Sequence, residues 1–389
     1  MTAIEFRNDA KAAPLRYAVG GMFAMIVAMG IGRFVFTPIL PSMMEGAGLT
    51  PGQAGLIASA NYAGYLIGAF LAAQAWGGGR ELVSFRLALW ASALLCFAMA
   101  LADGVVAFSV IRLLAGLASA FVMVFGLTIV FSRLAAGGRL HLSWLHFGGV
   151  GVGIGASAVL VTALISVHLD WRAEWGGAAI LSVLCLLPAG FLVGAGPLSV
   201  DAPRVEPALP RSPALFAVIL AYGIFGFGYI ITATFLVAIV RASHGSYVFE
   251  GLVWLATGIA ATPSVLLWTG SVRRIGLVQT FALGCMVEAA GVAASVIVPG
   301  RIGPLIGGIL LGGTFMAITA IGLQAARELA PEAPRRVLAM MTAAFGIGQI
   351  IGPLAAGYLA SANGSFEGAS LAAAAALTLS AAIAISARP

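Results

Sequence analysis

The sequence has few charged residues and little cysteine. Charged side chains make up 9% of the 389 residues, whereas a soluble protein carries about 25%. So small a share cannot cover a water-exposed surface, which excludes a soluble enzyme, a nucleic-acid-binding protein and a disordered scaffold. Cysteine occurs three times, at Cys96, Cys185 and Cys285, each alone within an apolar stretch. A disulfide framework and a Cys-x-x-Cys metal site are therefore excluded as well.

Apolar side chains are abundant instead. They occupy 61% of the positions, and the mean hydropathy is +1.06. A helix needs about 20 mostly apolar residues to cross the hydrocarbon core of a bilayer, and twelve such runs can be marked along the chain. They are expected at 17–41, 51–75, 84–102, 105–131, 144–167, 175–196, 213–240, 248–270, 277–298, 302–327, 337–360 and 368–386. The pattern predicts an all-helical membrane protein in a lipid bilayer.

The longest polar stretch divides these runs into two sets of six. Residues 197–212 hold four prolines, two acidic residues and two arginines. Equal sets joined in this way are typical of a duplicated bundle with parallel repeats. We therefore expect two six-helix bundles with pseudo-two-fold symmetry, one over residues 1–196 and one over residues 213–389, with 197–212 as a cytoplasmic linker.

Lysine and arginine gather in alternate connections. With the N-terminus in the cytoplasm, fifteen of the twenty basic residues fall in the tails or inner loops, and only Arg172, Arg241 and Arg301 fall in outer ones. Cytoplasmic loops carry the excess of basic residues in membrane proteins. The net charge of +6 is thus a signal of topology and not of a nucleic-acid partner. It predicts a multi-pass protein of the cytoplasmic (inner) membrane with both termini in the cytoplasm.

Two arginines lie inside the apolar runs. At a rise of 1.5 Å per residue, Arg33 is about 12 Å and Arg112 about 10 Å from the outer ends of their helices, so their depths are similar. A charge at this depth is costly and faces a partner or a water-filled cavity. Two guanidinium groups without nearby carboxylates suit an anion, because each can hold a carboxylate through two parallel hydrogen bonds. Either arginine could instead neutralise Glu288 or bond to backbone carbonyls.

Glu288 is the single acidic residue deep within an apolar run. Proton-driven transport often uses such a membrane carboxylate, so Glu288 is a candidate for coupling to protons, and Glu250 near a helix end is another. Neutral polar and aromatic side chains recur on two further runs at helical spacing, Asn61 and Tyr65 on one and Thr342, Phe345 and Gln349 on the other. With Tyr229 they are candidates for lining a substrate site, and hydrogen bonding between helices is the alternative for each.

Several motifs resemble one family of membrane proteins. These are Gly30-Ile31-Gly32-Arg33-Phe34-Val35-Phe36-Thr37-Pro38, Ala58-Ser59-Ala60-Asn61-Tyr62-Ala63-Gly64-Tyr65, Gly312-Gly313-Thr314-Phe315 and Gly348-Gln349-Ile350-Ile351-Gly352-Pro353. The chain resembles the major facilitator superfamily, and these motifs are similar to its YbfB/YjiJ branch. The resemblance implies twelve helices in two bundles and secondary transport. It also places the arginine of Arg112-Leu113-Leu114-Ala115-Gly116 in or near the central cavity and Glu288 on a peripheral helix.

The function expected from these features is secondary active transport. The two arginines favour a small organic anion, in particular a carboxylate, as the substrate carried by alternating access. The alternative is an exporter of amphipathic drugs, for which a broad aromatic cavity matters more than paired arginines. An enzyme would need a nucleophile, a metal or an acid and base pair, and the short loops offer no such set. We therefore expect no enzymatic activity, no cofactor and no metal.

Overall fold

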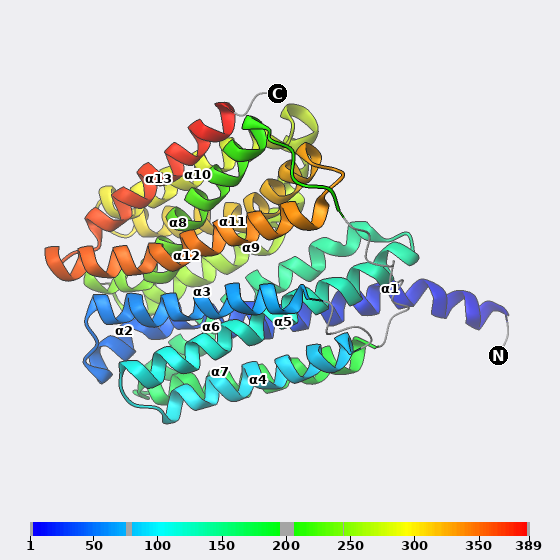
Figure 1. Ribbon diagram of the computed structural model, residues 1–389. Helices are drawn as coiled ribbons and strands as arrows, with labels where there is room; N and C mark the ends of the chain where they lie inside the picture. The colour runs from blue at the N-terminus through cyan, green and yellow to red at the C-terminus, as the bar shows by residue number, and fades with distance from the viewer. Residues whose placement is uncertain (1–2, 75–79, 195–205, 244, 387–389) are drawn as a thin grey trace.

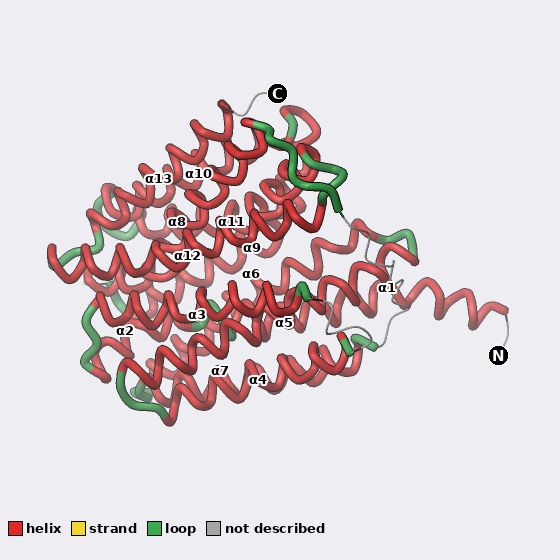
Figure 2. The backbone as a smooth tube through the Cα atoms, in the orientation of Figure 1, coloured by secondary structure: helices red, strands yellow, loops and turns green. Residues whose placement is uncertain are grey.

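The computed structural model describes residues 3–74, 80–194, 206–243 and 245–386. Within these residues the backbone consists of helices and connecting loops, without strands (Figure 2). Twelve of the described segments are long and apolar enough to cross a membrane, which confirms the twelve predicted runs. Most of the predicted linker, residues 197–205, lies outside the described residues.

The helices before the linker form six membrane spans, the first of which contains α1, η1 and α2. Their bounds are α1 Ala3–Met25, η1 Ile26–Ile31, α2 Phe36–Ala47, α3 Pro51–Ala72, α4 Glu81–Leu101, α5 Val105–Ala136, η3 Leu140–Leu142, α6 Ser143–Ser166 and α7 Trp171–Leu192. The helices after it are α8 Pro213–Ala242, α9 Tyr247–Ile275, α10 Leu277–Ile297, α11 Ile302–Leu329, α12 Pro334–Asn363 and α13 Glu367–Ser386. Most ends differ from the expected ones by a few residues, because hydropathy reports the apolar core and not the polar caps.

Local sequence determines where several helices begin. Thr50 accepts a hydrogen bond from the backbone of Gln53, whose side chain bonds back to the Thr50 backbone, and Pro51 follows at the first helical position of α3. Asp170 and Ser212 cap α7 and α8 through their side chains. Such caps satisfy backbone N–H groups that the first turn leaves free.

The helices make two kinds of contact, within each set of six and between the two sets (Figure 1). In the first set α3 and α4 pack on α5, and α1 packs on α6; in the second set α8 packs on α12 and α13, and α10 packs on α11. Between the sets, α3 packs along α12, α6 along α9, and α2 against α8. The α6–α9 contact depends on glycine, because a Cβ on Gly258 would lie 2.5 Å from the backbone nitrogen of Gly155.

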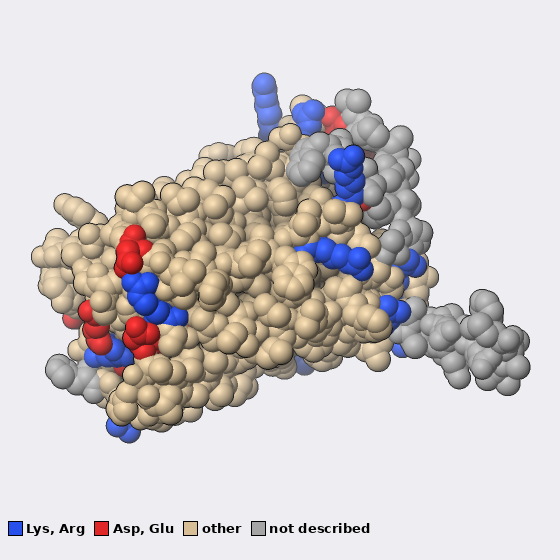
Figure 3. Space-filling view, turned by 90° about the horizontal axis from the view of Figure 1, so that it is seen from below, with Lys and Arg blue, Asp and Glu red and all other residues tan. Residues whose placement is uncertain are grey.

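The bundle has two ends of different charge. We call the end where α7 finishes and α8 begins the linker end, and the end where α2, α8 and α12 finish the Arg241 end. On the face seen in Figure 3, a broad middle region is mostly uncharged, while acidic and basic side chains gather toward the Arg241 end and mainly basic ones toward the linker end. Large apolar side chains such as Leu94, Phe191 and Leu267 are exposed along the helices, as expected for a surface in contact with lipid.

Candidate functional site

The first membrane segment is broken at Arg33. The single membrane span predicted over 17–41 is confirmed as Pro14–Ala47, but its regular helix is interrupted between α1 and α2. The N–H of Gly32 bonds to the carbonyl of Val27, five residues back, and a π-helical turn precedes four residues without regular helix. Pro38 adds to the break because it has no N–H to donate. Gly30 also packs directly on α6, where a Cβ would lie 2.5 Å from the Cα of Gly153.

Arg112 bonds to the carbonyls at this break. From α5, its Nη1 donates to the carbonyl of Gly32 at 2.8 Å and its Nη2 donates to the carbonyl of Arg33 at 2.9 Å. The Asn61 amide on α3 donates to the carbonyl of Arg112 at 2.8 Å. Irregular backbone inside a membrane persists only where other groups satisfy it. Of the two roles considered for Arg112, these bonds favour the support of the backbone at the break.

Arg33 is held differently, although it is just as deeply buried. Its side chain is 3% exposed, and the guanidinium carbon lies 4.6 Å from the ring centre of Tyr62 and 4.7 Å from that of Tyr65. Among the described residues, Nε and Nη2 of Arg33 have no hydrogen-bond partner. No ion pair joins either buried arginine to Glu288 within this part of the chain. A buried charge of this kind calls for a ligand or water.

Residues of the second set complete the surroundings of Arg33. Phe34 packs edge-on against Phe315 of α11 at 5.8 Å, and Phe315 stacks on Tyr229 of α8 at 5.9 Å. Tyr229 in turn stacks on Phe345 of α12 at 5.6 Å and accepts a hydrogen bond from the Gln349 amide.

The structure therefore brings five of the candidate residues together, namely Arg33, Tyr65, Tyr229, Phe345 and Gln349. Asn61 and Arg112 support the backbone beside them, and Thr342 lies partly exposed one turn before Phe345 on α12. Sequence reasoning missed Tyr62 and Phe315 as neighbours of this group. Both belong to motifs that carry the family resemblance, but single-sequence patterns do not show which aromatic side chains face a shared space.

Glu288 lies on α10 behind these residues. It is fully buried, and its Oε2 accepts a hydrogen bond from Thr314 of α11 at 2.9 Å. The next residue along α11, Phe315, stacks on Tyr229. Consecutive residues of a helix point in different directions, so Glu288 and Tyr229 contact different sides of α11.

Replacing Glu288 by glutamine should change ligand affinity by no more than about a factor of two, which is about 0.4 kcal/mol of binding free energy. The amide keeps the volume and an oxygen acceptor for Thr314. Equilibrium binding to the purified variant checks this expectation. A large loss of affinity in a variant that melts like the wild type would place Glu288 in the binding site.

Several hydrogen bonds join the two sets toward the Arg241 end. Thr37 donates to the carbonyl of Ala233 at 2.6 Å, and the hydroxyl groups of Tyr62 and Thr234 lie 3.1 Å apart. The backbone N–H of Gly52 donates to the hydroxyl of Ser361 at 2.9 Å. The two sets are thus in direct polar contact on this side of Arg33.

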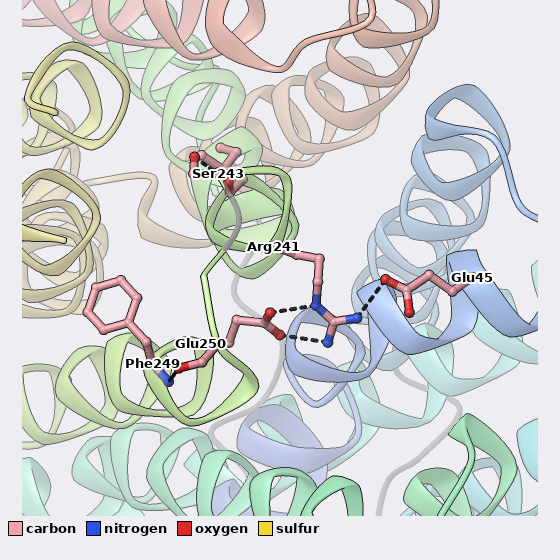
Figure 4. A network of polar contacts seen from close by, with 7 residues as sticks. Glu45, Arg241, Ser243, Phe249 and Glu250 are labelled. Atoms are coloured by element: carbon pink, nitrogen blue, oxygen red, sulfur yellow. Dashed lines mark hydrogen bonds and ion pairs between the residues drawn. The ribbon is translucent and has the colours of Figure 1, made fainter. Parts of the chain in front are cut away.

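An ion-pair network lies at the same end (Figure 4). The Nε and Nη2 of Arg241, at the end of α8, donate to the two carboxylate oxygens of Glu250 on α9 at 2.5 and 2.8 Å. Its Nη1 donates to Glu45 on α2 at 2.7 Å. Glu250 is buried within the network, whereas the side chain of Glu45 is 64% exposed. One arginine therefore bridges the first set of helices and the second.

Replacing Glu45 by glutamine should loosen this contact with little loss of stability, because an exposed ion pair contributes about 0.2 to 1 kcal/mol. A cysteine placed at the buried position Thr234 should then react with a thiol reagent roughly 1.4 to 5 times faster, which is the same free energy converted to a rate ratio. The measurement uses a chain whose native cysteines have been replaced. The control is Asp103→Asn, which removes the Arg172–Asp103 pair within the first set. Equal rates in all three chains would show that the bridge does not close this end.

Comparison with known proteins places the chain among membrane transporters. Residues 25–385 match the family described as "Uncharacterised MFS-type transporter YbfB". A chloramphenicol resistance protein of Streptomyces lividans is 27% identical over 249 residues, which cover 60% of each chain. The synaptic vesicle glycoprotein 2A of Rattus norvegicus is 27% identical over 191 residues, which cover 46% of this chain and 25% of that protein. The chain thus spans less than two thirds of these relatives.

Solved structures share the fold over nearly the whole chain. A mutant of the nucleoside transporter NupG superposes with a TM-score of 0.76 at 14% identity, covering 97% of this chain and 100% of that one. A bacterial homologue of the human lysosomal transporter Spinster, in an inward-facing and occupied conformation, gives a TM-score of 0.71 at 14% identity, covering 96% of each chain. At this identity the likeness concerns the fold alone. The family match spans nearly all of the twelve membrane helices, and the chain therefore belongs to the YbfB-type family of major facilitator superfamily transporters.

Proposed function

We propose that this transporter moves a small organic anion, a carboxylate, across the cytoplasmic membrane by alternating access. The observation that carries the proposal is the buried guanidinium of Arg33, whose Nε and Nη2 have no hydrogen-bond partner among the described residues. These two nitrogens form one edge of the guanidinium plane and donate in parallel. A carboxylate accepts both bonds at once.

Another arginine of the same protein uses this edge for such a bond. Nε and Nη2 of Arg241 hold the two oxygens of Glu250. Arg33 offers the same pair of donors among the rings of Tyr62 and Tyr65, where bulk water is excluded and a hydrogen bond to a charged group is stronger than in water. A carboxylate of the substrate would take the place that Glu250 takes at Arg241.

The second candidate function is export of amphipathic drugs. Two observations favour it, namely the aromatic side chains around Tyr229 and the similarity to a protein named for chloramphenicol resistance. A neutral or cationic drug would leave the Arg33 edge unpaired, and a cation would also be repelled by its charge. For this reason we place the anion first.

A thermal-shift screen of the purified protein distinguishes the two functions. A ligand present at 100 times its dissociation constant stabilises the folded state by about 2.7 kcal/mol. We expect small organic acids to raise the melting temperature of the wild type and to raise that of Arg33→Gln much less. Stabilisation by cationic or neutral drugs alone, unchanged by Arg33→Gln, would replace the anion proposal with drug export.

Transport would require the two bundles, residues 1–196 and 213–389, to rock about the site, with residues 197–212 as the linker. Opening of the Arg241 end would break the Arg241–Glu45 pair and the bonds of Thr37 and Tyr62 across the sets. Protons are the proposed coupling ion, with the buried carboxylate of Glu288 as the candidate to carry them. Glu288 would then affect the driving force without contacting the substrate.

We assign the linker end to the cytoplasm. Described basic residues near that end are Arg16, Arg80, Arg86, Arg133, Arg139, Arg211, Arg273, Arg274, Arg327, Arg335 and Arg336, against Arg172, Arg241 and Arg301 at the other. This asymmetry follows the positive-inside rule. A reporter that is active only outside the cytoplasm should therefore be silent when fused after Arg211 and active when fused after Gly300. Activity of the fusion after Arg211 would overturn the assignment.

A further inference from the structure

Aromatic side chains from both sets of helices surround the guanidinium of Arg33. Tyr62 and Tyr65 on α3 face it directly. Beyond them lies a group that we call the aromatic wall, consisting of Tyr222 and Tyr229 on α8, Phe315 on α11 and Phe345 on α12. The anion-transport proposal accounts for the arginine but does not account for so many rings beside it.

The rings of the aromatic wall lie nearly parallel. Phe345 stacks on Tyr222 with centres 4.8 Å apart and planes at 23°, and on Tyr229 at 5.6 Å and 12°. Tyr229 stacks on Phe315 at 5.9 Å and 8°. Aromatic pairs that fill a core without other constraint adopt edge-on as well as offset-stacked geometries. A set of parallel planes is suited to receive another flat ring.

One ring beside Arg33 and one ring of the aromatic wall keep part of their surface free. Tyr65 and Phe345 are partly exposed, whereas Tyr222 and Tyr229 are almost fully buried. They belong to helices that pack together, and their neighbours Leu66 and Gly346 are in contact, since a Cβ on Gly346 would lie 2.8 Å from a methyl carbon of Leu66. Tyr65 and Phe345 therefore lie on helices that pack together, the first in contact with Arg33 and the second with Tyr229.

One buried acceptor near these rings also lacks a donor. The amide nitrogen of Gln349 donates to the hydroxyl of Tyr229, while its Oε1 has no hydrogen-bond partner within the described part of the chain. The Gln349 side chain is fully buried. A buried acceptor left unpaired costs free energy, so a ligand with a hydroxyl group would be favoured here.

We infer that the substrate is a planar aromatic carboxylate, preferably with a hydroxyl group on the ring. The inference rests on the anion-transport proposal. The carboxylate pairs with Nε and Nη2 of Arg33, the ring stacks between Tyr65 and Phe345, and the ring hydroxyl donates to Oε1 of Gln349. Aliphatic acids of the same size satisfy Arg33 and lose the stacking, and uncharged aromatic compounds leave Arg33 unpaired.

Benzoate and cyclohexanecarboxylate test the ring directly, because they share charge and approximate size and differ in the flat π-system. Equilibrium binding of each radiolabelled acid is measured on the purified full chain, with binding to Arg33→Gln subtracted to correct for partition into detergent. We expect benzoate to bind roughly two- to tenfold more tightly, as expected for one aromatic pair. 4-Hydroxybenzoate should bind more tightly than benzoate, and Gln349→Leu should remove that gain.

Phe345→Leu should bring the ratio of benzoate to cyclohexanecarboxylate affinity close to one while Arg33 still binds both acids. The matched control is Phe366→Leu, which removes a ring from the Phe235–Phe366 pair, also 4.8 Å apart, toward the Arg241 end. This control should leave the ratio at its wild-type value. If Phe345→Leu does not fold, the wild-type ratio decides by itself.

The outcomes distinguish the inference of an aromatic substrate from the proposal of anion transport on which it rests. Equal, Arg33-dependent binding of both acids by the wild type would overturn the aromatic substrate and leave the anion site standing. Absence of Arg33-dependent binding for every acid would overturn both. A ratio that favours benzoate and is unchanged in Phe345→Leu would show that the ring does not stack on the aromatic wall, and would overturn the inference as stated.

Discussion

Replacing Arg33 by glutamine is expected to weaken binding of the anionic substrate by about one to two decades, which corresponds to the 1.5 to 3 kcal/mol of a hydrogen bond to a charged group. Glutamine removes the charge and the parallel donors. Arg33→Lys keeps the charge without the planar edge and should give an intermediate loss. Equilibrium binding of a substrate found in the thermal-shift screen measures both.

Stability is the control for this experiment. Nε and Nη2 of Arg33 make no hydrogen bond to the described residues, and removing an uncompensated buried charge does not destabilise a fold. The melting temperature of Arg33→Gln should therefore equal or exceed that of the wild type in the absence of substrate. A properly folded Arg33→Gln protein that binds or transports the anion as well as the wild type would disprove the anion site.

Arg112→Leu is expected to lose stability, whereas Arg33→Gln is expected to lose substrate binding and keep its stability. It removes two charge-assisted hydrogen bonds to the carbonyls of Gly32 and Arg33 and leaves both oxygens unsatisfied inside the membrane. At 1.5 to 3 kcal/mol each, the loss in free energy of unfolding is about 3 to 6 kcal/mol. Denaturant titration of the variant in detergent measures it. Arg112→Lys, which can keep one of the two bonds, should recover part of the stability.

Arg172→Leu provides the matched control, because Arg172 also donates to two backbone carbonyls, those of Ala100 and Ala102, from a partly exposed position. Water can replace those bonds, so its loss should be far smaller. Substrate binding should fall together with stability in Arg112→Leu, since the backbone of Arg33 loses its support. Lost binding at unchanged stability would instead make Arg112 a direct ligand of the substrate.

Most of the fold could be predicted from the sequence. The twelve spans follow from a composition that water cannot solvate, and their number is confirmed. The interruption between α1 and α2 could not be predicted from hydropathy, since Ile26, Val27 and Phe34 are as apolar as any helix requires. The signal was present in Gly30, Gly32 and Pro38, but glycine and proline also occur in unbroken membrane helices.

The candidate site could be predicted only in part. The depth of Arg33 and of Arg112 follows from helix rise, and burial of both is observed. Their different surroundings cannot be predicted from the residues next to them in the sequence, because each is an arginine flanked by apolar residues. One guanidinium bonds to backbone carbonyls and the other lies among tyrosine rings, and this difference arises from the packing of α5 and α3 around the break.

The sequence by itself determined that the protein lies in a membrane, where its helices run and which residue types carry charge into the bilayer. These properties depend on local composition, because each residue contributes its own free energy of transfer from water to lipid. Only the tertiary structure decided which side chains meet. Gln349 and Tyr229 are 120 residues apart, and Arg241 and Glu45 are 196 apart. The first pair joins two helices of the second set, the other joins the two sets, and no local pattern specifies the partner across such a distance.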